Sequence, residues 1–257
     1  MDEVTPVLVC GMGRSGTTNT LRVLNAHPSV ALNGEIPLSI LKHFFTFLDG
    51  VDKTYGERGK LSEGWQSRKS EYMLDSFGAM SKGGTGNARK HNSADFRGHK
   101  SPRLETMFEK YEQHFGKRGP LPRYFYCARN PFDCWRSYRE MPWTSYMRAE
   151  EFLEDYVASF ARLKVMQEHV EGRVTVVNLD ELKKAPDVFE FYEEKLFAPL
   201  GIEMPGSTMN RIEKAQEDKT PSTASKLPDE DKTTIANYPG IAEILATHFP
   251  AAISASR

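Results

Sequence analysis

The stretch VLVCGMGRSGTTNTLRVLNAHP, residues 7–28, decides how this chain begins to fold. Its first residues, 7–10, form an apolar run that is typical of a buried strand in a parallel sheet. A loop of glycine, arginine and hydroxyl residues follows, and Thr17–Ala26 has the pattern of a helix. This order predicts a cradle for a phosphate-like anion, because the N–H groups of the loop and the N-terminus of the helix face the ligand.

The loop differs from the ATP-binding pattern G-x-x-x-x-G-K-[ST] at one decisive position. Gly11 and Gly16 have the correct spacing, but Thr17 stands where that pattern requires lysine. Arg14, inside the loop, supplies a cation whose fork of N–H groups suits phosphate oxygens. The loop therefore predicts a terminal phosphate-like group as its ligand, and the plainer interpretation is a tight glycine turn between a strand and a helix.

The loop residues are candidates for binding this group through backbone N–H groups, hydroxyls or the guanidinium. They are Gly13, Arg14, Ser15, Gly16, Thr17 and Thr18. Asp180, which follows a predicted strand at 173–179, is a weak candidate for a magnesium ligand. We therefore predict that the loop works without a metal ion.

A second candidate anion site follows the aromatic run RYFYCAR at 123–129. Arg129 ends this predicted strand, and Ser137 lies about two turns into a helix. Asn130 is the expected cap of that helix and Pro131 its first residue. A guanidinium and a hydroxyl that converge in this way can bind one phosphate. The alternative interpretation is that Arg129 is only a charge at the end of a strand.

Strands and helices alternate along the chain, which predicts a parallel sheet with helices on both faces. We expect one α/β domain over residues 1–257, with three layers and a central sheet of about four or five strands. Residues 49–98 are poor in apolar side chains, so we expect a variable lid or acceptor-binding segment there, with a mobile loop at 81–98; the plainer interpretation is a surface insertion. The other predicted elements are a strand at 30–32, helices at 38–48, 103–115, 150–171, 187–200 and 241–249, and a polar loop at 220–231.

The composition excludes several classes of function. Lysine and arginine number 34 and aspartate and glutamate 35, for a formal net charge of −1, so the basic excess typical of nucleic-acid binding is missing. Three cysteines argue against a disulfide framework, and no apolar run approaches the roughly 18 residues of a membrane span. Because the start of the chain at residues 1–3 is acidic and the apolar run at 7–10 is short, we expect no secretory leader. We expect a cytoplasmic protein without a nucleic-acid partner.

Several of these motifs together resemble one family. GMGRSGTT at 11–18 and CARNPFDCWRSY at 127–138 resemble the motifs of sulfotransferases that use 3′-phosphoadenosine-5′-phosphosulfate (PAPS). LNAHPSVALNGE at 24–35 is similar to the branch that contains tyrosylprotein and many bacterial sulfotransferases. The resemblance covers about residues 5–185, with a weaker similarity at 219–227.

This resemblance implies a P-loop NTPase-like fold and a set of roles. The first loop would bind the 5′-phosphosulfate, and Arg129 with Ser137 the 3′-phosphate, leaving adenosine 3′,5′-bisphosphate (PAP) as product. Glu35 would be the base that accepts the acceptor's proton. Lys100, in the segment GHKSPR, would contact the transferring sulfuryl group together with Arg14. The implied reaction uses no metal.

The catalytic candidates also have plainer interpretations. Glu35 precedes Pro37 and can be an acid that a helix dipole favours. Lys100 can be an ordinary surface lysine. His99, beside it, is a second candidate base, although a partly buried structural histidine is the favoured interpretation.

A late segment, DKTPSTASK at 218–226, resembles a loop that closes over the nucleotide in this family. The resemblance implies phosphate contacts from Lys219, Ser225 and Lys226, and the alternative is a solvated polar loop. Leu179 occupies the position where the family often has a tyrosine that contacts adenine. The residue that contacts adenine is therefore left open.

We expect a sulfotransferase that moves the sulfuryl group of PAPS to an acceptor hydroxyl by in-line transfer. A sugar, lipid or small-molecule alcohol is favoured over protein tyrosine, although Arg89, Lys90, His91 and Arg97 would supply a basic groove for an acidic peptide. The alternatives are a P-loop kinase or NTPase-like enzyme, against which Thr17 argues, and a non-catalytic nucleotide-binding protein. The sequence leaves the oligomeric state open.

Overall fold

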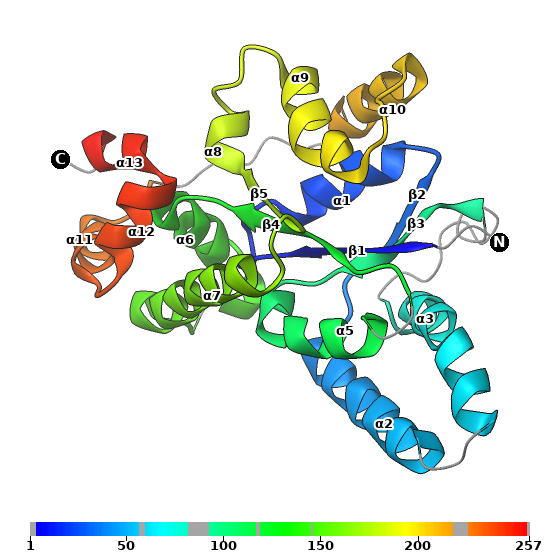
Figure 1. Cartoon of the computed structure of the whole chain (residues 1–257). Helices are drawn as coiled ribbons and strands as arrows, with labels where there is room; N and C mark the ends of the chain where they lie inside the picture. The colour runs from blue at the N-terminus through cyan, green and yellow to red at the C-terminus, as the bar shows by residue number, and fades with distance from the viewer. Residues whose placement is uncertain are drawn as a thin grey trace.

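Five parallel strands form the central sheet of the computed structural model, in the order β2-β3-β1-β4-β5 (Figure 1). The strands are β1 (Thr5–Cys10), β2 (Val30–Asn33), β3 (Phe96–Lys100), β4 (Arg123–Ala128) and β5 (Val174–Asn178). The structure describes residues 4–56, 60–81, 93–116, 119–144, 146–217 and 226–255. The predicted three-layer α/β fold with a parallel sheet is confirmed.

Strand β1 lies at the centre of the sheet, between β3 and β4. Val9 pairs with Lys100 on one side and with Phe125 on the other. Val7, Leu8 and Val9 are fully buried, which explains the unbroken apolar run, because helices cover both faces of a parallel sheet. Since all five strands run in the same direction, their carboxyl ends meet at one edge.

Helices cover both faces of this sheet (Figure 1). One face carries α1 (Thr17–Ala26), α9 (Val188–Tyr192) and α10 (Gly206–Glu217). The other face carries α2 (Leu38–Gly56), α3 (Lys60–Met80), α5 (Phe108–Phe115) and α7 (Ala149–His169). Alternate residues of β1 enter the two cores, Val7 and Val9 the first and Leu8 and Cys10 the second.

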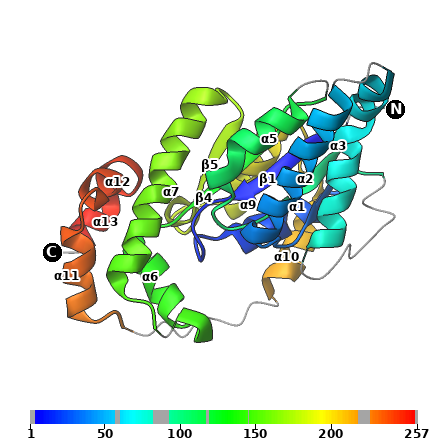
Figure 2. The same ribbon diagram turned by 90° about the horizontal axis from the view of Figure 1, so that it is seen from below.

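The C-terminal helices pack at the end of the molecule beside α7 (Figure 2). They are α11 (Asp229–Asn237), α12 (Ile241–His248) and α13 (Pro250–Ala255). Several shorter elements lie at the carboxyl edge of the sheet or on the face that α9 covers. They are η1 (Leu104–Met107), α6 (Pro131–Arg139), η2 (Pro142–Thr144), α8 (Leu179–Leu182), η3 (Glu193–Phe197) and η4 (Ala198–Leu200).

The predicted start of α6 is confirmed. Asn130 caps the helix by accepting a hydrogen bond from the backbone N–H of Asp133, and Pro131 is the first helical residue. The long helix predicted at 150–171 is α7, and Gly172 follows it in the left-handed conformation. These two boundaries follow from local signals that the rest of the fold leaves unchanged.

The structure corrects the expected secondary structure within residues 49–98, while the role of this segment as a lid or acceptor-binding region stays a prediction. α2 continues well past residue 49, α3 is a long helix, and residues 96–98 belong to β3 rather than to a mobile loop. The stretch 82–92 lies outside the described residues. α3 forms although its apolar residues are sparse, because Met73 and Phe77 are four apart and both are fully buried against the core.

Other boundaries differ for identifiable reasons. The helix predicted at 103–115 splits into η1 and α5, and η1 begins only after Arg103, which has a left-handed backbone with φ of 63°. The helix predicted at 187–200 is α9 followed by η3 and η4. α10 was not predicted, and α11 begins inside the predicted polar loop at 220–231.

All three cysteines are free and buried, as expected of a chain without a disulfide framework. Burial raises the pKa of Cys127 to about 12, so its thiol stays protonated near neutral pH. Within the described ranges, no helix combines the length and the apolar character that crossing a bilayer requires.

Candidate active site

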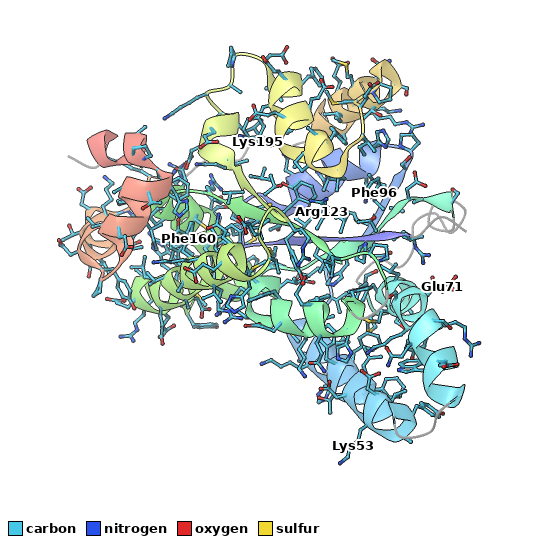
Figure 3. All side chains as sticks on the ribbon, viewed as in Figure 1. Lys53, Glu71, Phe96, Arg123, Phe160 and Lys195 are labelled. Carbon is cyan, nitrogen blue, oxygen red and sulfur yellow. The ribbon has the colours of Figure 1, made fainter. Side chains whose placement is uncertain are left out.

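Residues from four strand ends gather at the carboxyl edge of the sheet. The loop after β1 carries Arg14, β2 leads to Glu35, β3 ends at Lys100 and β4 leads to Arg129. Arg123, labelled in Figure 3, begins β4, so the candidate site lies at the opposite edge from this residue. The carboxyl edge is where ligands bind in open α/β sheets.

The loop after β1 has the backbone of an anion cradle. Gly11 and Gly16 have φ values of 114° and 102°, and Arg14 has 66°. A Cβ atom on Gly11 would lie 2.3 Å from the carbonyl oxygen of Cys127, so only glycine fits there. Gly16 is the N-cap of α1, and no side chain of the described residues caps this helix. Its first N–H groups therefore face the site without a side-chain partner.

The two predicted anion sites adjoin each other. Arg14 Nε donates a hydrogen bond to Ser137 Oγ at 3.0 Å, and Arg129 Nη1 donates to the carbonyl oxygen of Arg14 at 3.3 Å. Arg129 Nη2 lies 3.8 Å from a carboxylate oxygen of Asp133. Arg129 Nε is buried and has no hydrogen-bond partner within the described part of the chain. A buried N–H group without a partner costs free energy, and a bound anion would satisfy it.

Lys100 and Glu35 form an ion pair on the other side of the loop. Lys100 Nζ lies 3.1 Å from Glu35 Oε2, and the Lys100 side chain is 8% exposed while that of Glu35 is 41% exposed. Ser101 joins the two strand ends that carry them. Its Oγ accepts a hydrogen bond from the N–H of Ile36 and donates one to the carbonyl oxygen of the same residue. The cation is thus buried, and the carboxylate is partly exposed to solvent.

A model of the sulfotransferase family matches residues 6–190 of the chain. This chain belongs to the sulfotransferase family. The family predicted from the motifs is therefore confirmed. The matched range contains the loop after β1 and the four charged residues at the strand ends.

Solved structures similar to this sulfotransferase show the same fold. The sulfotransferase domain of the olefin synthase of Synechococcus PCC 7002 is 18% identical, with 96% of each chain covered and a TM-score of 0.55. Sulfotransferase STF9 from Mycobacterium avium is 15% identical, with 96% of this chain and 77% of that chain covered and a TM-score of 0.53. No curated protein matches this sulfotransferase in sequence.

His99 lies in the core of the sulfotransferase rather than in the candidate site. Its side chain is fully buried, and Nε2 lies 2.7 Å from the hydroxyl of Tyr111. Burial lowers the pKa of His99 to about 3, against the opposing effect of a hydrogen bond with the backbone of Lys100, while the charge of the Lys100 side chain lowers it further. A histidine without access to solvent fits the structural interpretation and not that of a base.

Asp180 holds the start of α6 instead of facing the loop. Its carboxylate accepts hydrogen bonds from the backbone N–H and the side-chain amide of Asn130, and it also contacts Lys183. These bonds occupy both oxygens. In the described ranges, no group of three or more histidine, cysteine or acidic side chains is arranged to hold a metal ion.

Tyr138 lines the candidate site and was missed from the sequence. A Cβ atom on Gly13 would lie 2.9 Å from Tyr138 Cε2, so the ring covers this glycine closely. Cys134, one turn earlier on α6, donates a hydrogen bond from Sγ to the carbonyl oxygen of Gly13 at 3.1 Å. The one available signal was the helical spacing of residues 134 and 138, which places both on the face of α6 that meets the loop.

The late-loop residues are only partly described. Lys219 and Ser225 lie outside the described residues, and Lys226 is exposed. Lys226 lines a cavity of about 560 Å³ between α6, α8 and the C-terminal helices. Leu179 packs against Gly16, with Cδ1 3.3 Å from the position of a Cβ atom there. This aliphatic side chain offers packing at the start of α1 but no ring for stacking.

Proposed function

We propose that this sulfotransferase transfers the sulfuryl group of PAPS to an acceptor hydroxyl. The observation that carries the proposal is the pair of adjoining anion sites, one at the glycine loop and one at Arg129 and Ser137. PAPS bears a phosphosulfate on the 5′ oxygen and a phosphate on the 3′ oxygen, so its binding requires two anion sites. ATP binding requires only the glycine loop, together with a lysine at the position that Thr17 occupies here.

The groups that would hold the nucleotide lie at the start of α1 and around Arg129. The N–H groups at the start of α1 and the hydroxyls of Thr17 and Thr18 suit the 5′-phosphosulfate. The buried Nε of Arg129 suits the 3′-phosphate, and Ser137 Oγ adds a donor beside it. The contacts that Lys219, Ser225 and Lys226 would add remain part of the proposal.

The ion pair of Glu35 and Lys100 supports in-line transfer. The acceptor oxygen attacks the sulfur, the bond between sulfur and the bridging phosphate oxygen breaks, and negative charge builds on that oxygen. Lys100 and Arg14 would neutralise this charge. The acceptor proton passes to Glu35, whose carboxylate is partly exposed to solvent. The products are a sulfate ester and PAP, and two side-chain cations take the place that a metal ion has in many phosphoryl transferases.

The favoured acceptor is a sugar, lipid or small-molecule alcohol. A groove for an acidic peptide would need free cations near the site. Arg97, one of the residues considered for that groove, is 5% exposed and paired with Asp75. The other three, at 89–91, lie outside the described residues. We further propose that the chain forms one sulfotransferase domain, in which α2 and α3 shape the acceptor side.

The test is a reaction with PAPS in EDTA against panels of sugars, lipid alcohols, phenols and tyrosine peptides. Release of PAP that depends on one acceptor class, with that acceptor gaining the mass of one sulfuryl group, supports the proposal. Phosphoryl transfer or hydrolysis with ATP and Mg²⁺, without PAP release from any panel, contradicts it.

A further inference from the structure

Glu105 is a fully buried carboxyl group directly behind the glycine loop. Its Oε2 accepts a hydrogen bond from the backbone N–H of Gly11 at 3.0 Å, and Oε1 accepts one from the hydroxyl of Ser159. The Ser159 hydroxyl in turn lies 2.8 Å from that of Tyr126. Ionisable side chains are rarely buried so completely unless they are paired or hydrogen-bonded, as Glu105 is here. Neither anion binding nor proton transfer, as proposed above, involves Glu105.

The turn that carries Glu105 makes hydrogen bonds to both the backbone N–H and the carbonyl oxygen of Gly11. The N–H of Arg103 donates to the carbonyl oxygen of Gly11 at 2.9 Å, while Glu105 accepts from its N–H. The N–H of Ser101 donates to the carbonyl oxygen of Val9 at 3.1 Å, so the hydrogen bonds between this turn and the glycine loop continue to the end of β1. The same turn follows Lys100 without an intervening residue. One short segment therefore connects the glycine loop to the lysine of the candidate site.

Both connected segments, the glycine loop and the turn after Lys100, contain a residue with strained backbone. Arg14 and Arg103 are the two residues other than glycine with positive φ in the described ranges, at 66° and 63°. Such conformations cost free energy and persist where surrounding contacts determine them. Gly11 itself has φ of 114° and approaches the backbone of Cys127 too closely for a side chain. The loop thus depends on external hydrogen bonds for its shape.

We propose that Glu105 is a positioning residue that locks the glycine loop to the Lys100 turn, so that Arg14 and Lys100 act on one bound group. The proposal rests on the proposed function for the identity of that group. Its structural content, the dependence of the loop on Glu105, stands on the hydrogen bonds alone. This role requires a side chain long enough to accept the hydrogen bond from Gly11, and it does not require a negative charge.

The protonation state of Glu105 leaves this role intact. Burial raises the pKa of Glu105, while hydrogen bonds from Ser159 and Gly11 and the charge of Arg103 oppose the rise. In the ionised form both oxygens accept. In the protonated form Oε1 can donate to Ser159 while Oε2 still accepts from Gly11. A neutral side chain of the same length should therefore work.

Two variants separate reach from charge. Glu105→Gln keeps the reach and removes the charge, whereas Glu105→Asp keeps the charge and shortens the side chain by one methylene. Amide hydrogen exchange of the loop, measured without nucleotide, and the Kd for PAP are the readouts. We expect Glu105→Asp to raise exchange at Gly11 and the Kd by about tenfold or more, and Glu105→Gln to stay within about threefold of wild type.

Glu112→Asp is the matched control. Glu112 accepts hydrogen bonds from Tyr124 and Arg173 at the amino edge of the sheet, so its loss lowers stability far from the loop. We expect it to leave loop exchange unchanged. If Glu105→Asp does not fold, Glu105→Met takes its place, because it fills similar volume without an acceptor.

Wild-type loop exchange in Glu105→Asp, or equal damage in Glu105→Gln and Glu105→Asp, overturns the positioning role. Wild-type protein that does not bind PAP overturns the proposed function instead, and the exchange measurement still decides the role of Glu105.

Discussion

Lys100 Nζ lies 3.1 Å from Glu35 Oε2, although the two residues are 65 positions apart in the chain. They meet because β2 and β3 are neighbours in the sheet and both end at the same edge. The lysine is buried and the carboxylate half exposed. This pairing places a buried cation beside the partly exposed carboxylate that we propose as the base.

Glu35→Gln should lower kcat by roughly 10²- to 10⁴-fold, the usual contribution of a positioned base, while the Kd for PAP changes by less than about threefold. The amide keeps the size of the side chain but cannot take the acceptor proton. Steady-state kinetics and calorimetry measure the two quantities. Glu71→Gln, at an exposed position of α3 (Figure 3), is the control. Equal loss of turnover and nucleotide affinity in Glu35→Gln would contradict the assignment.

Lys100→Met should lower kcat by roughly 10²-fold or more, because the charge on the leaving oxygen would lose one of the two cations that we propose to neutralise it. Methionine fills the buried volume of the lysine stem, so the fold should be retained. Lys53→Met, on the exposed surface of α2 (Figure 3), is expected to be neutral. A variant at Lys100 with unchanged turnover and weaker nucleotide binding would assign this lysine to binding instead.

Arg129→Ala should weaken PAP binding by about 10- to 100-fold and leave the affinity for adenosine 5′-monophosphate unchanged. The monophosphate lacks the 3′-phosphate, so the preference for PAP over it isolates the second anion site. Ser137→Ala should reduce the same preference by less, since one neutral donor is lost. Arg139→Ala, on the same helix but paired with Asp231, is the control. An unchanged preference in Arg129→Ala would refute this site.

Stability should fall as the pH drops below about 6.5, the ordinary pKa of histidine. His99 has its pKa lowered to about 3 by burial, and His114 to about 4 by burial and by Lys69. Below about pH 6.5 these histidines are protonated in the unfolded chain but still neutral in the folded chain. The free energy of unfolding therefore falls as the pH drops, from the unfolded pKa of each histidine down to its folded pKa. At full effect one such histidine contributes a slope of about 1.4 kcal/mol per pH unit.

Urea unfolding at several pH values between 7 and roughly 4 measures this slope. His99→Gln should flatten it, whatever the change in absolute stability. His43→Gln, at an exposed position of α2, should leave it unchanged. Equal slopes in His99→Gln and wild type would show that His99 does not carry the effect.

Much of the fold around the candidate site was predictable because its signals are local. The glycine spacing of the loop, the Asn-Pro start of α6 and the apolar run of β1 each depend on a few adjacent residues. Such signals predict the local structure of a segment without information about the rest of the chain. The sheet then follows, because alternating strands and helices allow few arrangements.

The parts that escaped prediction depend on contacts between distant segments. Arg14 reaches Ser137 across 123 positions, and Glu105 reaches Gly11 across 94. Helix α3 was missed because glycine and polar residues outweigh its few buried side chains, whose value lies in the core they contact. The contacts that bury these side chains join segments far apart in the chain, so a local pattern does not contain them.

The most direct test of the account is calorimetric titration of the wild-type protein with PAP in EDTA, beside ADP with Mg²⁺. Two adjoining anion sites predict tight binding of PAP without metal, and weaker binding of ADP, which has no 3′-phosphate. Preference for ADP with Mg²⁺ would contradict the account, because Arg129 and Ser137 would then contribute nothing and the loop would be an unusual ATP cradle.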